Sequence, residues 1–348
     1  MKALIIVCLA LVFSITEATA TFTTVVSFGD SISDNGNLYA SFGKPKSPYW
    51  KGRYSNGPVW SEYLASFLTQ SKALSQSFEL KGFANLATLS LSSYASLANT
   101  TCVLKSFATS ITSTISKPGS TAFHDFAYAG ALANILDAEV EYQKPIPDIA
   151  SQYSNFTNSS LSLDYASTLF TVYVGINDIW YPPEVGAVPN TTYIVGNIST
   201  LISNLTSLGA KHIMVNNIFP IESSPTVNGN STLQALYTYY VTDSSAGYNA
   251  ILKAKIESWK VSHPSVTFTY NDFHGFGSHV MSAAGLTMFS FKTVADECYK
   301  GSGTSFCGAP TDHFFWDYLH PTTKMHLLFA GYAYYNLMVL SNWAAASL

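Results

Sequence analysis

Charged residues are scarce in this chain of 348 amino acids. Lysine, arginine, aspartate and glutamate make up 11% of it, whereas about 25% is usual for globular proteins. The formal net charge is −4, the isoelectric point is about 6.0, and no basic stripe occurs. The sequence therefore lacks the surface that a nucleic-acid partner requires, and its charge indicates no polyanionic partner. Serine, threonine, asparagine and any attached sugar must supply much of the surface polarity.

Cysteine is scarce too, with four residues in the whole chain. Cys8 falls in an apolar N-terminal run, whereas Cys298 and Cys307 bracket a loop rich in glycine and serine. A disulfide between these two would brace the segment that follows, and closing so short a loop contributes about 2 to 3 kcal/mol at most. Cys102 is left over, either as a buried thiol or as an intermolecular partner.

No linker, repeat or charge run divides the chain, so we expect residues 21–348 to form one large domain. The first twenty residues have the pattern of a secretory signal peptide. Lys2 precedes an apolar run, which ends before the small-x-small site Ala18-Thr19-Ala20. We therefore expect residues 1–20 to be removed and the mature protein to be secreted and extracellular. A monomer is expected.

The other long apolar stretch runs from Met325 to Ala346. His326, Asn336 and Asn342 interrupt it, and no basic flank follows. These features favour a packed C-terminal helix over a transmembrane segment or a removable anchor signal.

Export makes the Asn-x-Ser/Thr sequons relevant, because several would carry glycans in a eukaryotic secretory route. A bacterial source would remove this inference. We expect some sequons to stay unoccupied, since Asn197 and Asn204 lie on one amphipathic stretch and would be partly shielded. The candidate sites are Asn99, Asn155, Asn158, Asn190, Asn197, Asn204 and Asn230.

Apolar, β-branched segments alternate with segments of helical periodicity, which predicts an α/β fold with a parallel sheet. Strands are predicted at residues 23–28, 123–128, 168–174, 211–218 and 265–270, and helices near residues 58–69, 191–207 and 231–261. The stretch from Ser71 to Ser120 fits this alternation poorly. It is interpreted as an insertion or lid, or as a surface pair of helices.

Three distant stretches contain the side chains that acyl transfer needs. They are Phe28-Gly29-Asp30-Ser31, Gly175-Ile176-Asn177-Asp178 and Asp317-Tyr318-Leu319-His320. Ser31 offers an oxygen nucleophile at a predicted strand end, and His320 a base to remove its proton. Asp317 offers a carboxylate to orient the imidazole, and Asn177 a side-chain N–H for an oxyanion. Taken singly, each residue also has a structural interpretation, such as a helix cap or a turn.

The spacing of Asp317 and His320 lets both side chains leave a tight turn on the same side. Pro321 further predicts that His320 is extended at the entrance of a helix. A competing pattern is a metal site, because His313, Asp317 and His320 would share one face of a helix. The intervening aromatic residues and Pro321 favour a buried loop instead, and the remaining histidines are interpreted as scaffold.

With these stretches in this order, the sequence resembles the GDSL (SGNH) hydrolase family of esterases and lipases. The first stretch reads Gly29-Asp30-Ser31-Ile32, with isoleucine where the family has leucine. Gly52–Trp60 resembles the segment that follows in secreted lipase-like and acetylesterase-like members. Asp125–Ala131 is similar to the family's strand that ends in an oxyanion-hole glycine, which makes Gly130 the counterpart.

The resemblance implies a flavodoxin-like three-layer α/β/α sandwich with the active site at the carboxyl ends of the strands. It implies a serine esterase or lipase in which Ser31, His320 and Asp317 form a catalytic triad. The backbone N–H groups of Ser31 and Gly130 and the side chain of Asn177 would form the oxyanion hole. Neither a cofactor nor a metal is expected.

Aromatic residues near these stretches are predicted to wall the substrate pocket: Trp180, Tyr181, Phe314, Phe315 and Trp316. Such walls suit an acyl-chain groove, as in a lipase or phospholipase, or a stacked sugar, as in a carbohydrate O-acetylesterase. An acyltransferase would use the same acyl-serine. The substrate is therefore a small-molecule, lipid or acetylated-glycan ester. The alternative of a different class is a secreted binding protein that keeps the fold without the chemistry.

Overall fold

The computed structural model describes residues 22–69, 121–133, 146–184 and 187–337. The predicted signal peptide and the whole Ser71–Ser120 stretch, with Asn99 and Cys102 in it, lie outside these residues. All five predicted strands are present and form one parallel sheet in the order β2-β1-β3-β4-β5. This is the flavodoxin-like order. The strands are β1 (Thr24–Gly29), β2 (Ala122–Asp125), β3 (Thr168–Tyr173), β4 (His212–Asn216) and β5 (Thr267–Asn271).

The central strands are buried because helices cover both faces of the sheet. Every residue of β1 and of β3 is buried, as expected for strands inside a parallel sheet. Val26 of β1 lies opposite Phe170 of β3 and His124 of β2. β2 is half-exposed because it forms the edge of the sheet.

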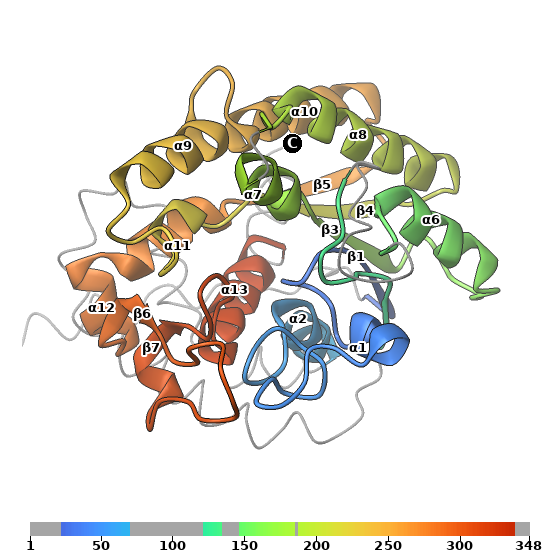
Figure 1. The fold of residues 1–348 in the computed structure, drawn as a ribbon. Helices are drawn as coiled ribbons and strands as arrows, with labels where there is room; N and C mark the ends of the chain where they lie inside the picture. The colour runs from blue at the N-terminus through green and yellow to red at the C-terminus, as the bar shows by residue number, and fades with distance from the viewer. Residues whose placement is uncertain (1–21, 70–120, 134–145, 185–186, 338–348) are drawn as a thin grey trace, which may run out of the picture.

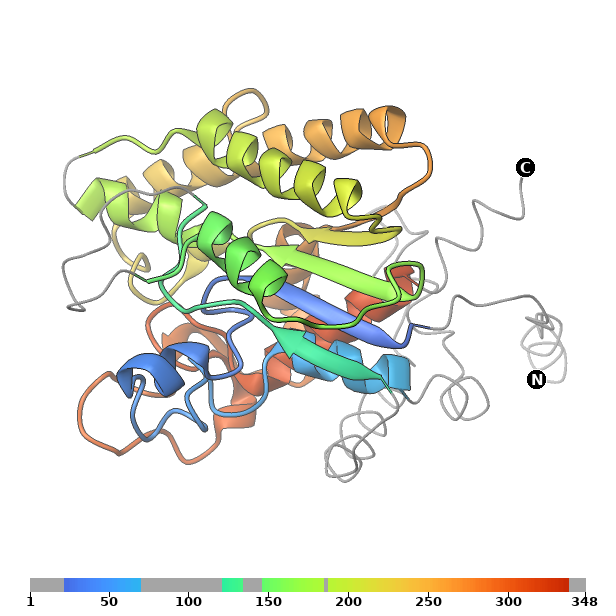
Figure 2. The ribbon, with the colours of Figure 1, turned by 90° about the vertical axis from the view of Figure 1, so that its right-hand side faces the viewer.

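The helices complete a three-layer sandwich, which confirms the predicted architecture (Figures 1 and 2). One face of the sheet carries α6, α8 and α10, and the other carries α2 and α13. Helix α13 is buried on most of its surface and packs on α2. The bounds are α2 (Trp60–Thr69), α6 (Ile149–Asn158), α8 (Thr191–Ser207), α10 (Tyr248–Ser262) and α13 (Thr323–Tyr335).

Residues 231–261, predicted as one helical segment, form two helices, so the prediction of a continuous helix was wrong. α9 (Ser231–Thr242) ends before Gly247, and α10 begins at Tyr248. A Cβ atom at position 247 would lie 2.5 Å from the backbone nitrogen of Asp243. The chain therefore turns tightly between the helices at a position where only glycine fits.

The remaining elements flank the carboxyl edge of the sheet. A small second sheet pairs β6 with β7. Within the described ranges, we find no helix both long enough and apolar enough to cross a membrane. The elements are α1 (Asn37–Phe42), α7 (Ile176–Glu184), α11 (Phe273–Met281), α12 (Ala283–Phe289), β6 (Thr293–Glu297) and β7 (His313–Phe315).

Candidate active site

Ser31 lies two residues beyond the carboxyl end of β1. The chain makes a single turn there, since the N–H groups of Ser33 and Asp34 both donate to the Asp30 carbonyl oxygen at 3.0 Å. No helix follows this turn directly, since α1 begins only at Asn37. The turn aims the Ser31 side chain at the edge of the sheet where ligands bind in parallel α/β folds.

His320 is brought to Ser31 from the other end of the chain. Its Nε2 lies 2.9 Å from the Ser31 Oγ, and its Nδ1 lies 2.8 and 3.0 Å from the two carboxylate oxygens of Asp317. Because a carboxylate only accepts hydrogen bonds, Nδ1 carries the ring proton and Nε2 is left to accept from the Ser31 hydroxyl. An imidazole held in this way can take the serine proton.

Asp317 is fully buried, and its environment still favours the charged carboxylate. Burial by itself would raise the pKa of Asp317, but the charge and hydrogen bonds of His320, with a hydrogen bond from Tyr49, lower it. The backbone N–H groups of Leu319 and His320 also donate to Oδ1, at 2.9 and 2.7 Å. These donors allow a carboxylate to stay ionised away from water.

The helix entrance predicted for His320 is displaced. Thr322 is the N-cap of α13, which begins at Thr323. Pro321 instead forms an isolated antiparallel bridge with Phe315. The segment from Asp317 to His320 is therefore a tight turn, held at its end by a short strand contact rather than by a helix.

Gly130 lies beside Ser31 in a backbone conformation that favours glycine, with φ of 82°. Asp34 ties the two turns together, because its carboxylate accepts the Ala129 N–H at 2.8 Å and the Gly36 and Asn37 N–H groups. Among the described residues, the backbone N–H groups of Ser31 and Gly130 donate to no protein acceptor. Both are therefore available to a ligand in the pocket that these residues line.

Asn177 stands in the first turn of α7, directly after β3 and Gly175. Gly175 has φ of 118°, and a Cβ there would lie 2.8 Å from the Tyr248 ring. The Asn177 Nδ2 donates to the Ala131 carbonyl oxygen at 2.8 Å, and the neighbouring Asp178 accepts the Ala133 N–H. Because an amide nitrogen carries two hydrogens, the bond to Ala131 fixes the side chain and uses one of them.

Asp30 is fully buried next to the nucleophile position. Its Oδ1 accepts the Ile32 N–H at 3.1 Å. Burial raises the pKa of Asp30 to about 7, against the opposing effect of backbone hydrogen bonds. The side chain shapes the turn after β1 and does not line the pocket.

A small pocket lies over Ser31 and His320, and two of the five predicted wall residues line it. Trp180 is buried and stacked on Tyr237 with ring centroids 4.8 Å apart, whereas Tyr181 is 43% exposed. The residues lining the pocket are Ser31, Tyr54, Ala129, Gly130, Ile146, Asn177, Trp180, Tyr181, Tyr318, Leu319 and His320.

Phe315 and Trp316 do not line this pocket, and neither does Phe314, so these predictions were wrong. Phe314 and Phe315 belong to β7, a strand buried on both sides, and both are part of the main core. Trp316 stacks on Tyr299 in a separate small cluster. Their proximity to Asp317 in the sequence did not indicate which way these three side chains point, because the chain is packed on both sides here.

Two tyrosines that the sequence analysis missed take their place. Tyr54 lies against the His320 ring with centroids 4.8 Å apart, and Tyr318 is 48% exposed at the pocket rim. Tyr318 stands between Asp317 and His320, and in a tight turn an intervening residue points to the opposite side. This alternation of side-chain direction was the feature of the sequence that could have identified Tyr318 as a pocket residue. Tyr54 lies in the Gly52–Trp60 segment that the sequence analysis had already noted.

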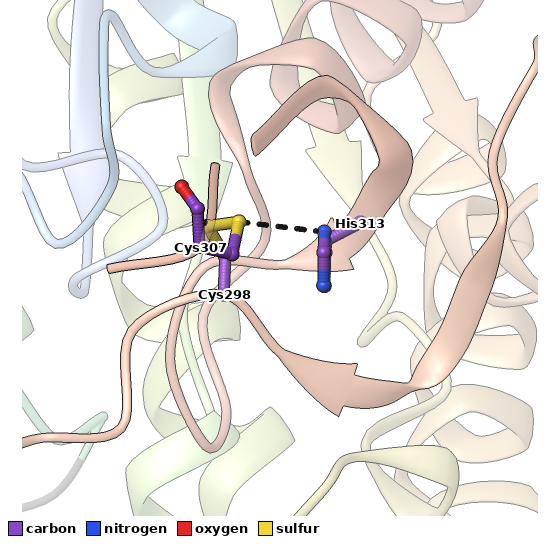
Figure 3. A group of neighbouring side chains, drawn as sticks. All are labelled: Cys298, Cys307 and His313. Atoms are coloured by element: carbon purple, nitrogen blue, oxygen red, sulfur yellow. Dashed lines mark hydrogen bonds between the residues drawn. A yellow bond between two sulfur atoms is a disulfide. The ribbon is translucent and has the colours of Figure 1, made fainter. Parts of the chain in front are cut away.

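A disulfide joins Cys298 and Cys307, as predicted from their spacing (Figure 3). The ring of His313 lies beside it, with Nδ1 3.5 Å from the Cys307 sulfur and 3.2 Å from the Ala309 carbonyl oxygen. Across the described ranges, these three residues are the one group of three ligand-type side chains close enough to share an ion. Because the sulfurs are bonded to each other, neither is a thiolate ligand in this state.

The metal site considered for His313, Asp317 and His320 required a helix that does not form. His313 lies in β7 beside the disulfide, whereas Asp317 and His320 occupy the turn next to Ser31. The three side chains therefore do not share a face.

Removing the disulfide is expected to cost stability. The double variant Cys298→Ser/Cys307→Ser should lower the free energy of unfolding by about 2 to 3 kcal/mol, because the unfolded chain regains the entropy of a short open loop. Urea unfolding followed by tryptophan fluorescence measures this change. An unchanged unfolding midpoint would contradict a bracing role.

His326 is close enough to His320 for the two rings to interact electrostatically. It is buried in α13, and its Nδ1 accepts the Trp60 N–H at 3.3 Å. Burial, with a smaller effect of His320, lowers the pKa of His326 to about 3. It is therefore neutral at the pH values at which proteins ordinarily work and acts as a helix-packing group.

The sequons within the described residues differ in exposure. Asn155, Asn158, Asn190 and Asn230 are exposed. Asn197 and Asn204 are half-buried and line a groove between α6 and α8. The side-chain oxygens of Asn190 and Asn230 cap α8 and α9, and this leaves their nitrogens directed elsewhere.

The sandwich fold and the polar residues at its carboxyl edge are those of esterase- and lipase-type hydrolases. The chain belongs to the GDSL-like lipase/acylhydrolase family, whose family model matches residues 25–332.

One curated relative matches a short region of the chain. The chain is 43% identical over 60 residues to a phosphatidylcholine-sterol acyltransferase from Aeromonas hydrophila. That match spans 16% of this chain and 18% of the relative. The crystal structure of a GDSL-like lipase from Parabacteroides merdae aligns with a TM-score of 0.40 and 11% identity, over 93% of this chain and 98% of that one.

Proposed function

We propose that the protein is a serine esterase that hydrolyses carboxylic esters through an acyl-serine intermediate. The observation that carries the proposal is the continuous hydrogen-bonded chain from the Ser31 Oγ through His320 to Asp317. Membership of the GDSL-like lipase/acylhydrolase family supports it.

In the proposed cycle, His320 removes the Ser31 proton as the oxygen attacks the ester carbonyl. Asp317 holds the imidazole in the required tautomer and stabilises the imidazolium that forms. His320 then returns the proton to the leaving alcohol, and water repeats the sequence on the acyl-serine. No step in this cycle requires a cofactor.

The developing oxyanion would be bound by three N–H groups. Those of Ser31 and Gly130 come from the backbone, and the third is the Asn177 amide hydrogen that does not donate to Ala131. Donors fixed in this way require no reorganisation during the reaction, which is why such groups accelerate acyl transfer strongly.

The test is a panel of p-nitrophenyl esters from acetyl to palmitoyl, with an acetylated polysaccharide and a phospholipid. Purified wild-type protein and the Ser31→Ala variant are assayed side by side. Hydrolysis by wild type alone supports the proposal, and the preferred chain length separates an esterase from a lipase. A folded wild-type protein that cleaves none of these esters would favour the binding-protein alternative.

Asn177→Ala is expected to lower kcat by about 10²- to 10³-fold, because one oxyanion donor is lost. KM should change little if the contact forms mainly in the transition state. Asn228→Ala is the matched control, since its exposed amide also donates to a backbone carbonyl, that of Ala295. Folded Asn177→Ala protein with the kcat of wild type would reject the oxyanion role.

Acyl transfer is the second candidate, favoured by the 60-residue match to a phosphatidylcholine-sterol acyltransferase. The acyl-serine proposed here can pass its acyl group to an alcohol instead of water. Adding a sterol or a short alcohol to the ester assay distinguishes the outcomes by product. A new ester favours transfer, and free acid alone favours hydrolysis.

We also propose that the enzyme acts outside the cell, on the basis of the signal-peptide pattern in residues 1–20. In a eukaryotic host, glycans would attach most readily at the exposed sequons Asn155, Asn158, Asn190 and Asn230. Glycosidase treatment followed by mass spectrometry of sequon peptides tests this assignment. Occupancy confined to Asn197 and Asn204 would contradict it.

A further inference from the structure

Tyr49 donates its phenolic hydrogen to the Oδ2 of Asp317 at 2.7 Å. The two residues are 268 positions apart in the sequence. The same oxygen accepts the His320 Nδ1–H at 2.8 Å. Tyr49 therefore contacts the carboxylate that orients the proposed base, but it does not line the pocket over Ser31.

Tyr49 is held in place by a small aromatic cluster outside the main core. The cluster consists of Cys298, Tyr299 and Trp316, with Tyr49 and Cys307 packed against it. Tyr49 meets the rings of Tyr299 and Trp316 edge to face, with centroids 5.4 and 6.3 Å away. The backbone crosses the cluster as well, since the N–H groups of Cys298 and Tyr299 donate to the carbonyl oxygens of Phe315 and Trp316.

The chain after Tyr49 is fastened to the segment that carries His320. The Ser55 hydroxyl donates to the Pro321 carbonyl oxygen at 2.9 Å. The Asn56 side-chain oxygen accepts the Thr323 N–H at 2.8 Å, and the Thr323 hydroxyl donates to the Pro58 carbonyl oxygen. These bonds fix the distance between the loop bearing Tyr49 and the turn bearing Asp317.

We propose that Tyr49 is a positioning residue for the esterase reaction, whose hydroxyl fixes the orientation of Asp317 and through it the basicity of His320. This inference rests on the proposed function. The alternative is that Tyr49 matters only as a packed ring. The two differ in the hydroxyl group alone, which a phenylalanine removes without changing the ring.

The hydroxyl can act as a donor over the whole pH range of an esterase assay. Burial, and then the charge and hydrogen bond of Asp317, raise the pKa of Tyr49 above its ordinary value. In the part of the chain that the structure describes, the other titratable groups facing His320 are Tyr54, Tyr318 and His326. Because burial lowers the pKa of His326 to about 3, His326 does not change charge between pH 5 and 9.

Removing the Tyr49 hydroxyl should shift the pH dependence of the rate in a predictable direction. Without the Tyr49 hydrogen bond, the charge on Asp317 is less dispersed, so it attracts the imidazolium form of His320 more strongly. More of the base is then protonated at a given pH, and the acid limb of the rate profile moves to higher pH. The imidazole is also held less firmly toward Ser31, which lowers kcat.

The experiment compares wild type with Tyr49→Phe, using p-nitrophenyl acetate hydrolysis and labelling by a fluorescent fluorophosphonate from pH 5 to 9. Tyr49→Phe is expected to lose about tenfold in kcat at neutral pH, with KM nearly unchanged. Its acid limb should move upward by about half a pH unit in both assays.

Tyr299→Phe is the matched control. It removes a hydroxyl from the same cluster, one that donates to the Gly303 carbonyl oxygen at 3.1 Å, and it keeps the ring. It should have the wild-type profile. Equal losses in both variants, or a wild-type profile for Tyr49→Phe, would overturn the positioning role. Wild type that neither reacts with the fluorophosphonate nor hydrolyses the ester would instead contradict the proposed function.

Discussion

Ser31→Ala and His320→Ala are each expected to lower kcat by about 10⁴-fold or more while leaving the protein folded. The first removes the oxygen that forms the acyl intermediate, and the second removes the base that takes its proton. Both side chains lie at the edge of a pocket, so smaller residues leave the core intact. Ester hydrolysis, with circular dichroism and thermal unfolding as folding checks, measures the effect.

The controls are alanine substitutions of the same residue types away from the pocket. Ser41 lies exposed on α1, and His263 lies at the end of α10. Ser41→Ala and His263→Ala should keep wild-type turnover. The double variant Ser31→Ala/His320→Ala should be little worse than either single variant, because the two groups act as one unit. A folded Ser31→Ala protein with substantial turnover would contradict the mechanism.

Asp317→Asn is expected to lower kcat by about 10³- to 10⁴-fold, although the two side chains have the same shape. The described residues that hydrogen-bond to the carboxylate all donate to it: Tyr49, the backbone of Leu319, and both the ring and the backbone of His320. An asparagine presents an NH₂ group where an acceptor is needed. His320 would then lose the partner that selects its tautomer.

Asp312→Asn serves as the control for this change. Asp312 lies just before β7 and pairs with Lys292 at the surface, where an ion pair contributes little. It should retain full activity. If Asp317→Asn also retained full activity in a folded protein, Asp317 would not orient the base.

The sheet was predictable because the composition of its central strands indicates that they are buried. β1 and β3 consist mostly of apolar and β-branched residues, the pattern expected of strands covered on both faces. The site followed from the sheet, since Ser31 and Asn177 each come directly after one of these strands. The carboxyl ends of neighbouring parallel strands meet at one edge.

The aromatic residues show where prediction from sequence fails. Trp316 is as close to Asp317 in the chain as Tyr318 is, and Phe315 is one residue further away. Phe315 and Trp316 are buried, whereas Tyr318 reaches the pocket. Local sequence does not encode that choice, because it depends on β6 and on the disulfide loop packing from the other side. Composition and spacing contain no equivalent of this tertiary information.

Tyr49 is a second case of the same kind. Its contact with Asp317 depends on hydrogen bonds that link Ser55, Asn56 and Pro58 to the chain near α13. No local sequence pattern predicts these long-range hydrogen bonds. The Gly52–Trp60 segment was noticed as a motif, but its role was not. The structure indicates that this motif joins the two ends of the active site.

The central claim is that Ser31 is the nucleophile, and it is tested most directly by locating a covalent adduct. Wild-type protein is treated with a fluorophosphonate, digested, and analysed by tandem mass spectrometry. We expect one phosphonyl group on the Ser31 hydroxyl, and none in His320→Ala treated for the same time. An adduct on another residue, or folded wild-type protein that forms none, would contradict the claim.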